Sequence, residues 1–229
     1  MADPDGGAGT YRLLLLRHGE IRSHRGDLPV TGRSLDAAEQ VGRRLGWPGR
    51  RRIRVLTGET LRTRQTAGAI AAGARHEGAG VEGPRVAFAL RNPDIYVAGD
   101  RVDMVSGAAA LAEQVPCFSE GEAAAVPFFA EFFDHPDRVG WWLRLTDVPG
   151  DDAATVAARI TRFAASLPDR ADDPADLIVG VTHSPVLRAC ALAHLGDDPG
   201  EPDWLTGLEI TVTPGRMVSV RRYPAPDPP

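Results

Sequence analysis

Two histidines and an arginine directly follow two apolar runs that have the length of β-strands. The first run, residues 11–16, contains four consecutive leucines and leads into Arg17 and His18. The second run, residues 177–182, leads into His183. Uninterrupted apolar runs of this length are typical of strands buried on both faces of a parallel sheet. Because ligands bind beyond the carboxyl ends of such strands, these side chains are candidates for chemistry.

A second arginine should come to the same edge from a helix. Residues 53–57 form a further predicted strand, and Arg62 lies in the first turn of the helix expected to follow it. Helical side chains lean toward the N-terminus of their helix, so the side chain of Arg62 should reach back to the strand ends. Two imidazoles, two guanidiniums and the N–H groups of helix N-termini would then surround one space. This set of donors predicts an anion site, and tetrahedral phosphate is its natural ligand.

Strand and helix patterns alternate along most of the chain. Helices are predicted, from apolar spacing and from capping or terminating residues, at 34–45, 60–72 (ended by Gly73), 153–167 and 185–195, the last with Ser184 as its N-cap. Strands are predicted at 11–16, 53–57, 85–90 and 177–182, with a closing hairpin at 209–213 and 217–222. This alternation predicts an α/β fold with a mostly parallel central sheet and helices on both faces.

The segment from about 91 to 150 does not follow this alternation. It contains several aromatic residues, and we expect a helical insertion packed over one edge of the sheet. Its aromatic cluster at 128–142 is interpreted as packing, with a role as a pocket wall as the alternative. No linker separates the insertion, so residues 11–223 are predicted to form a single domain. The flanking residues 1–10 and 224–229 are predicted to be disordered.

The composition excludes several classes of function. The chain has 229 residues with 26 basic and 31 acidic side chains, a formal charge of −5, and every basic residue is an arginine. Without lysine there is no Schiff-base chemistry, no attachment of pyridoxal phosphate and no lysine-bearing phosphate loop. The acidic balance disfavours nucleic acid as a partner. No apolar stretch approaches the roughly 18 residues of a membrane span, so a membrane is not expected as a partner either.

The N-terminal residues and the two cysteines bear on the cellular location of the protein. No apolar segment follows Met1, so the N-terminus is not a secretory signal. Cys117 and Cys190 form no C-x-x-C pair and are interpreted as reduced packing residues. We therefore expect a cytoplasmic protein, for which a monomer and a homodimer both stay open.

Three sequence motifs carry a resemblance to a known family. Residues 15–20 read Leu-Leu-Arg-His-Gly-Glu, residues 61–67 read Leu-Arg-Thr-Arg-Gln-Thr-Ala, and residues 181–184 read Val-Thr-His-Ser. In this order they resemble the signature of the histidine phosphatase superfamily, which has the phosphoglycerate mutase-like fold. Two further stretches, at 27–31 and 149–152, are similar to the family's D-x-P-[LV]-T loop and to the start of its late helix.

The resemblance implies a role for each residue at the strand ends. His18 is the expected nucleophile, which attacks phosphorus and becomes a phosphohistidine. Arg17, Arg62 and His183 are expected to hold the nonbridging oxygens and to stabilise their charge. These side chains supply the positive charge, so neither a metal ion nor another cofactor is expected. The secondary phosphate contacts are expected to be Ser23, His24 and Ser184.

The proton donor for the leaving alkoxide departs from the family pattern. The mutase-like branch carries a glutamate in a Leu-x-Glu context, and Asn92 places an amide there. We expect Asp94, two residues later, to be the acid. Glu120 and Glu122 in the insertion are the reserve candidates. The other branch carries its acid directly after the second histidine, and Ser184 at that position disfavours this branch.

The motifs together predict a metal-independent phosphomonoesterase, a histidine acid phosphatase-type hydrolase that acts on a small phosphorylated molecule through a phosphohistidine. The alternatives are a phosphoglycerate mutase-type phosphotransferase and a non-catalytic protein that binds a phospho-ligand. A mutase needs cationic contacts for its substrate carboxylate, and the insertion has no arginine between 102 and 137, which favours hydrolysis. The missing glutamate is what favours a binding protein.

Overall fold

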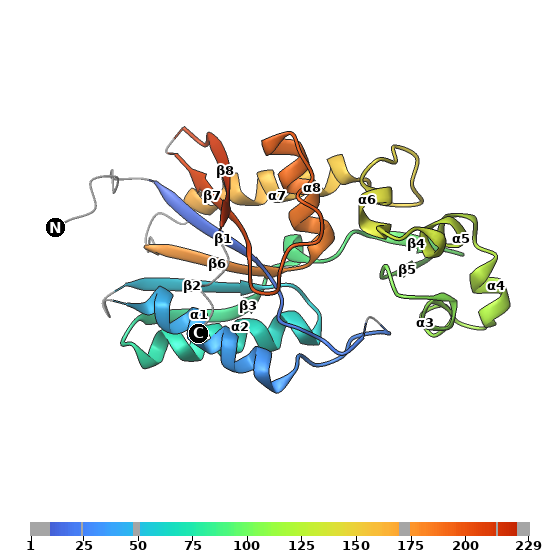
Figure 1. Cartoon of the computed structure of the whole chain (residues 1–229). Helices are drawn as coiled ribbons and strands as arrows, with labels where there is room; N and C mark the ends of the chain where they lie inside the picture. The colour runs from blue at the N-terminus through green and yellow to red at the C-terminus, as the bar shows by residue number, and fades with distance from the viewer. Residues whose placement is uncertain (1–9, 24, 48–50, 170–174, 214, 224–229) are drawn as a thin grey trace.

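A six-stranded sheet forms the centre of the fold, with its strands in the order β3-β2-β6-β1-β7-β8 (Figure 1). The computed structural model describes residues 10–23, 25–47, 51–169, 175–213 and 215–223. The strands of this sheet are β1 (Tyr11–Arg17), β2 (Arg52–Thr57), β3 (Gly80–Val86), β6 (Leu177–Thr182), β7 (Gly207–Val212) and β8 (Val218–Tyr223). The chain ends predicted to be disordered lie outside the described residues, apart from residue 10, and the single-domain boundaries stay a prediction.

Four neighbouring strands of the sheet run parallel, and two run antiparallel to them. Strands β3, β2, β6 and β1 pair in parallel. Strand β7 pairs antiparallel with β1, and β8 pairs antiparallel with β7, as the closing hairpin predicts. The mostly parallel α/β sheet expected from the sequence is therefore confirmed.

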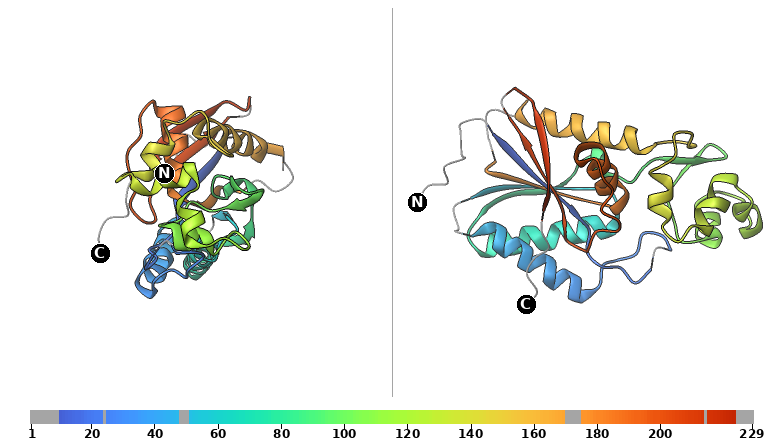
Figure 2. Two further views of the ribbon diagram at one scale, coloured as in Figure 1. Left: turned by 90° about the vertical axis from the view of Figure 1, so that its right-hand side faces the viewer. Right: turned by 45° about the horizontal axis from the view of Figure 1, so that its top comes forward.

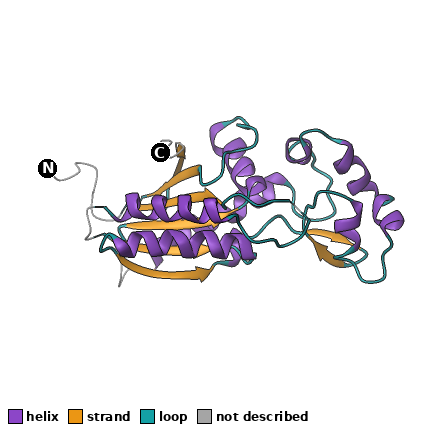
Figure 3. Cartoon of the chain, turned by 60° about the horizontal axis from the view of Figure 1, so that its bottom comes forward, coloured by secondary structure: helices purple, strands orange, loops and turns teal. Residues whose placement is uncertain are grey.

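Helices cover both faces of the sheet (Figure 2). The helices α1 (Gly32–Gly46) and α2 (Leu61–His76) lie side by side on one face (Figure 3). The helices α7 (Ala153–Ser166) and α8 (Ser184–Leu195) cover the other. Successive side chains of a strand point to opposite faces, and in β1 they divide accordingly. Leu13 and Leu15 join the apolar cluster of α7 and α8, whereas Leu14 and Leu16 join that of α1 and α2.

The predicted end of the second helix at Gly73 is wrong, because α2 continues to His76. Gly73 is buried where α1 and α2 touch, and a Cβ atom there would lie 2.0 Å from the carbonyl oxygen of Glu39. Gly42 in α1 makes the reciprocal approach, since its Cβ would lie 2.0 Å from the carbonyl oxygen of Ile70. The two glycines allow the helices to pack backbone against backbone.

The strand predicted at 85–90 is also displaced. Strand β3 spans Gly80–Val86, and Phe88–Leu90 form a short 3-10 helix, η1. The parallel register pairs the first residue of β3 with Arg52 and the last with Thr57, so β3 starts and ends level with β2. After β3, η1 turns the chain past the end of β2 toward β6, where Thr182 donates a hydrogen bond from its hydroxyl to the carbonyl oxygen of Leu90 at 2.7 Å.

The insertion lies beyond the carboxyl ends of the parallel strands, not over an edge of the sheet (Figure 1). Its elements are β4 (Ile95–Val97), β5 (Asp100–Val102), α3 (Ala108–Ala112), α4 (Glu120–Ala124), α5 (Pro127–Asp134) and α6 (Arg138–Trp142). The helices were expected, and the hairpin of β4 and β5 was not. The two ends of the insertion meet where Ile95 forms a β-bridge with Gly150.

The two cysteines differ in their surroundings. Cys190 is buried, as expected of a packing residue, whereas Cys117 is exposed, so its interpretation as a packing residue is wrong. Within the described residues no helix combines the length and the apolar character needed to cross a membrane.

Candidate active site

Strands β1 and β6 place the two histidines next to each other. In the parallel register Arg17 lies opposite Thr182, so the residues that follow, His18 and His183, leave the sheet at the same point. The backbone N–H of His18 donates to the carbonyl oxygen of Thr182 at 3.0 Å. The ring centroids of the two imidazoles are 5.3 Å apart, in an edge-to-face arrangement, and both side chains are buried.

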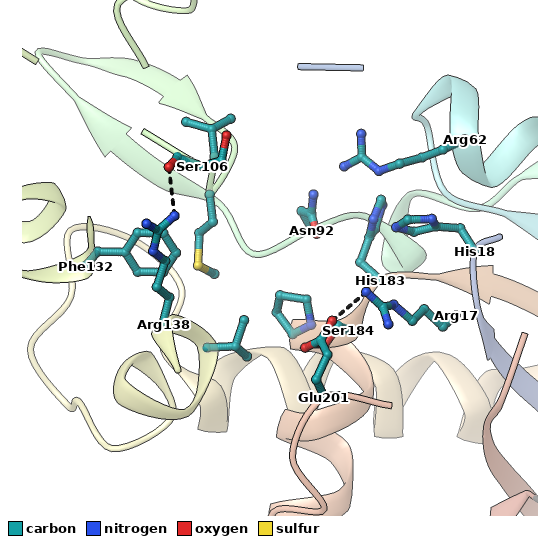
Figure 4. Close-up of a pocket in the computed structure, with 14 residues that line it drawn as sticks. Arg17, His18, Arg62, Asn92, Ser106, Phe132, Arg138, His183, Ser184 and Glu201 are labelled. Atoms are coloured by element: carbon teal, nitrogen blue, oxygen red, sulfur yellow. Dashed lines mark hydrogen bonds and ion pairs between the residues drawn. The ribbon is translucent and has the colours of Figure 1, made fainter. Parts of the chain in front are cut away.

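Arg17 and Arg62 complete the cationic group (Figure 4). They line one pocket together with His18, His183 and Asn92. Burial lowers the pKa of Arg17 to about 10, and burial also lowers the pKa of Arg62. Among the described residues, the buried Nε atoms of both arginines have no hydrogen-bond acceptor. Each guanidinium already pairs with one carboxylate, Glu201 for Arg17 and Asp27 for Arg62, but a buried donor without an acceptor is costly. The unused donors therefore favour binding a further anion at this end of the pocket.

The tautomer of His18 follows from its contact with the next residue. Nδ1 of His18 lies 2.8 Å from the carbonyl oxygen of Gly19, which can only accept, so Nδ1 carries the hydrogen. The lone pair of the neutral ring is then on Nε2. Gly19 is itself tightly enclosed, because a Cβ atom there would lie 2.4 Å from the hydroxyl oxygen of Ser34. Its N–H donates to the Thr66 hydroxyl at 2.9 Å, which joins the first motif to α2.

The loop between α8 and β7 supplies pocket residues that sequence reasoning missed. Glu201 lies 2.5 Å from a guanidinium nitrogen of Arg17 and accepts a hydrogen bond from the Ser184 hydroxyl at 2.6 Å. The guanidinium also stacks on Trp204, 3.4 Å from the ring centroid, and donates to the carbonyl oxygen of Pro202. No motif marks this loop. The pairing of β7 with β1 and hydrogen bonds from Ser184 and Arg188 of α8 bring it to the pocket.

Asp94, the acid expected from the sequence, is held away from the pocket by arginines. Its carboxylate accepts hydrogen bonds from Arg91 and forms an ion pair with Arg101 at 2.5 Å. Burial would raise the pKa of Asp94, but the hydrogen bond from Arg91 and the charges of Arg91, Arg101 and Arg159 outweigh it and lower that pKa. Asp94 is absent from the described residues that line the pocket. This geometry does not support Asp94 as a proton donor.

The remaining expected residues are distributed differently. Ser184 lines the pocket as the first residue of α8, whose N-cap is His183 rather than Ser184. Ser23 is half-buried and is not among the described pocket residues, and His24 lies outside the described residues. The reserve acids Glu120 and Glu122 are exposed on α4, where Glu122 forms a capping box with Ser119.

The far side of the pocket is built mainly by the insertion. The residues that line it there are Met104, Val105, Ser106, Phe132, Arg138 and Val139, with Pro185 from α8. Arg138 donates to the carbonyl oxygen of Ser106 at 2.8 Å (Figure 4), and no carboxylate of the described residues lies within ion-pair distance of it. Phe132 is both buried and pocket-lining, so interpreting the aromatic cluster as packing alone is wrong for this residue.

The pocket therefore has two chemically different ends. The inner end is cationic and lies at the carboxyl ends of β1 and β6, and the outer end is mostly apolar with one guanidinium. Within the part of the chain that the structure describes, no group of three or more His, Cys, Asp or Glu side chains could hold a metal ion.

Solved structures with the same fold include phosphatases and a mutase. A mycobacterial glucosyl-3-phosphoglycerate phosphatase is 19% identical, with a TM-score of 0.56 over 93% of this chain and 97% of that one. A phosphoglycerate mutase from Bacillus anthracis is 14% identical, with a TM-score of 0.56 over 93% of this chain and 92% of that one. A putative alpha-ribazole-5'-P phosphatase from Escherichia coli is 18% identical, with a TM-score of 0.54 over 94% and 96%. No family model and no curated protein sequence matches the chain.

These similarities establish a class of fold. The chain has the phosphoglycerate mutase-like fold of the histidine phosphatases, and the resemblance seen in its three motifs is confirmed at the level of the fold. All three motifs meet at one pocket of that fold, through Arg17, Arg62 and His183.

Proposed function

We propose that the protein is a metal-independent phosphomonoesterase that acts through a phosphohistidine on His18. The observation that carries the proposal is the cationic inner end of the pocket. There two imidazoles lie 5.3 Å apart, beside the buried guanidiniums of Arg17 and Arg62. Such a group matches the three nonbridging oxygens of a phosphoryl group and adds a nucleophile.

The reaction would take place in two displacements. Nε2 of His18 attacks phosphorus, the bond from phosphorus to the ester oxygen breaks, and the alcohol leaves with one added proton. A water molecule then attacks the phosphohistidine, the bond between phosphorus and nitrogen breaks, and phosphate leaves. The arginines and His183 would hold the nonbridging oxygens through both steps, because fixed cations stabilise the charge of the transition state at no cost of reorganisation.

Solved structures of the same fold support a phosphatase or a phosphotransferase. Two of those compared are described as phosphatases, one for glucosyl-3-phosphoglycerate and one putatively for alpha-ribazole-5'-P. Hydrolysis is favoured here because the outer wall of the pocket is mostly apolar and offers few cations to retain a second anionic group. We infer that the substrate is a small phosphate ester. The cytoplasmic location and the absence of a cofactor stay predictions.

A mutase is the second candidate, and Arg138 is the observation that favours it. Arg138 directly follows the stretch 102–137, which has no arginine, and it lines the outer end of the pocket. A guanidinium there could bind the carboxylate of a phosphorylated hydroxy acid, as a phosphoglycerate mutase requires. Product analysis separates the two candidates, because a phosphatase releases inorganic phosphate from a phosphoglycerate and a mutase returns its isomer.

The test of the proposal is a labelling experiment. The full chain is mixed in EDTA with a radiolabelled aryl phosphate and quenched within one turnover. We expect an acid-labile, base-stable label on His18. We also expect His18→Ala to lose the label and more than about a thousandfold of the turnover.

The matched control is His76→Ala, which removes an exposed histidine in the last turn of α2. It should label and turn over like the wild-type chain. Tight phosphate binding with neither label nor turnover in the wild-type chain would identify a phospho-ligand binding protein instead.

A further inference from the structure

The pocket lacks an obvious acid at the point where the leaving oxygen needs a proton. Asn92 lies between the cationic inner end and the outer wall of the pocket (Figure 4). Its position is fixed, because Arg159 donates to the backbone carbonyls of Arg91 and Asn92 at 3.0 and 3.3 Å. An amide cannot transfer a proton as a carboxylic acid does. The carboxyls near Asn92 are therefore candidates for this role, beside Glu201, which lines the pocket but is paired with Arg17.

The Asn92 amide points to one particular carboxyl. Its Nδ2 donates a hydrogen bond to Oδ1 of Asp103 at 3.2 Å. Asp103 directly follows β5, so the hairpin of β4 and β5 returns it to the residue from which the insertion departs. Asp103, like Asp94, is not among the described residues that line the pocket, but the three residues after it are. A carboxyl eleven positions away in sequence thus lies beside the amide.

The same carboxyl is also close to the cationic end. Asp27 forms an ion pair with Arg62 at 3.3 Å, yet the negative charge of Asp103 opposes the lowering of the Arg62 pKa more strongly than that of Asp27 does. Asp103 therefore lies near two pocket residues that come from different elements, Asn92 after η1 and Arg62 in α2. A phosphoryl group bound by Arg62 would lie next to this carboxyl.

Asp103 is held in place without being neutralised. Its backbone N–H donates to the Gln114 side chain at 2.8 Å, and the residue is half-buried. In the described part of the chain no arginine lies within ion-pair distance of its carboxylate, whereas Asp94 and Glu201 are both paired with arginines. A bound phosphoryl group would engage Arg62 and leave the Asp103 carboxyl, beside the Asn92 amide, without an arginine of its own among the described residues.

We propose that Asp103 is the proton donor of the first displacement and that Asn92 positions it. This inference rests on the proposed function. As the bond from nitrogen to phosphorus forms, the ester bond breaks and the Asp103 proton passes to the departing oxygen. In the second displacement the Asp103 carboxylate takes a proton from the attacking water, which restores the starting state.

The test compares two esters that differ in their need for an acid. Butyl phosphate has a poor leaving group, and 4-nitrophenyl phosphate has a good one. We expect Asp103→Asn to lower the turnover of butyl phosphate by about a hundredfold to ten-thousandfold. The loss on 4-nitrophenyl phosphate should be at least about tenfold smaller, because 4-nitrophenolate leaves with little assistance from an acid. Asp100→Asn, at an exposed aspartate of the same hairpin, is the matched control and should change neither rate.

A rescue variant separates chemistry from folding. Adding Asn92→Glu to Asp103→Asn places a carboxyl at the pocket-lining position beside residue 103 and should recover a large part of the butyl phosphate turnover. Asp103→Glu keeps an acid and should retain more of that turnover than Asp103→Asn. Equal losses on both esters in Asp103→Asn, or an ester-selective loss in Glu201→Gln instead, would overturn the proposal. A wild-type chain that forms no phosphohistidine would refute the proposed function itself, and the labelling experiment detects that separately.

Discussion

The guanidinium of Arg17 and the carboxylate of Glu201 form an ion pair of 2.5 Å inside the pocket that we assign to phosphate. The Glu201 side chain is half exposed, whereas that of Arg17 is only 6% exposed. The acidic partner therefore sits toward the opening of the pocket, where it occupies a donor that a phosphate oxygen would use. The anion must either share Arg17 with Glu201 or displace it.

Removal of the Glu201 charge should therefore strengthen phosphate binding. For Glu201→Gln we expect the inhibition constant of inorganic phosphate to fall by about three- to tenfold, equivalent to about 0.7–1.4 kcal/mol. The gain is modest because the half-exposed carboxylate is screened by solvent. Competitive inhibition of 4-nitrophenyl phosphate turnover measures it. Asp197→Asn in the same loop removes an exposed partner of Arg222 and should leave the constant unchanged.

The outer wall should select for apolar leaving groups. Met104 lines this wall and is only partly buried, so it can be shortened without opening the core. Met104→Ala should lower the preference for butyl over methyl phosphate, measured as the ratio of kcat/KM values, by about tenfold, since each buried methylene contributes about 0.8 kcal/mol. Met217→Ala, at a side chain that is 72% exposed, is the control and should keep the wild-type ratio. If Met104→Ala leaves the ratio of kcat/KM for butyl and methyl phosphate unchanged, the leaving group does not contact this wall.

A buried arginine ties the insertion to the helix that follows His183. Arg188 in α8 is 1% exposed and makes two hydrogen bonds to Asp137, the N-cap of α6, and two to Asp198. Arg188→Met should lower the free energy of unfolding by about 3 kcal/mol, because it leaves two carboxylates without their shared partner. Urea denaturation measures this loss. Arg222→Met breaks only an exposed pair and should cost less than about 1 kcal/mol.

The same contact should make stability depend on pH in acid. Hydrogen bonds from Arg188 lower the pKa of Asp137 to about 2, against burial, which opposes the change. A lowered pKa gives stability that is complete above the ordinary value near 3.8 and is lost as the pH falls toward 2. The difference in unfolding free energy between the wild-type chain and Asp137→Asn should thus be constant from pH 7 to 5, be mostly lost by pH 2 and vanish below it.

The exposure of the Asp137 side chain limits the size of this difference in unfolding free energy. The Asp137 side chain is 59% exposed, so solvent screening reduces the difference to about 1 kcal/mol. Asp169→Asn removes an exposed partner of Arg216 and serves as the comparison at each pH. A difference that grows as the pH falls would contradict the assignment.

The inner end of the pocket could be predicted from sequence because local patterns mark each of its residues. Parallel strands of one sheet end at the same edge, so the residues after β1 and β6 were expected at one edge. The direction of helical side chains predicted that Arg62 reaches that edge as well. The pairing of β1 with β6 joins distant parts of the chain, and the order of the three motifs was the sequence signal for it.

The acid and the outer wall could not be predicted in the same way. Asp94 is near Asn92 in sequence, and proximity along the chain made it the natural choice. The hairpin of β4 and β5 was not recognised, and it is this hairpin that returns Asp103 to Asn92. Likewise Glu201 reaches Arg17 through long-range contacts, the pairing of β7 with β1 and the hydrogen bond from Ser184. Gly73 lies inside a helix, where it packs against the backbone of Glu39.

The two ends of the insertion lie next to each other, and this arrangement links substrate selectivity to the supply of the proton. The two chain segments that enter and leave the insertion meet at the bridge between Ile95 and Gly150, and the N–H of Asp151 donates to the carbonyl oxygen of Asp94 at 2.7 Å. Replacing the whole insertion beyond this bridge would change two features at once. One is the pocket wall that contacts the alcohol of the substrate, and the other is Asp103, which we assign to protonate that alcohol. The residues at the carboxyl ends of β1 and β6, which we assign to bind and attack the phosphoryl group, would stay unchanged.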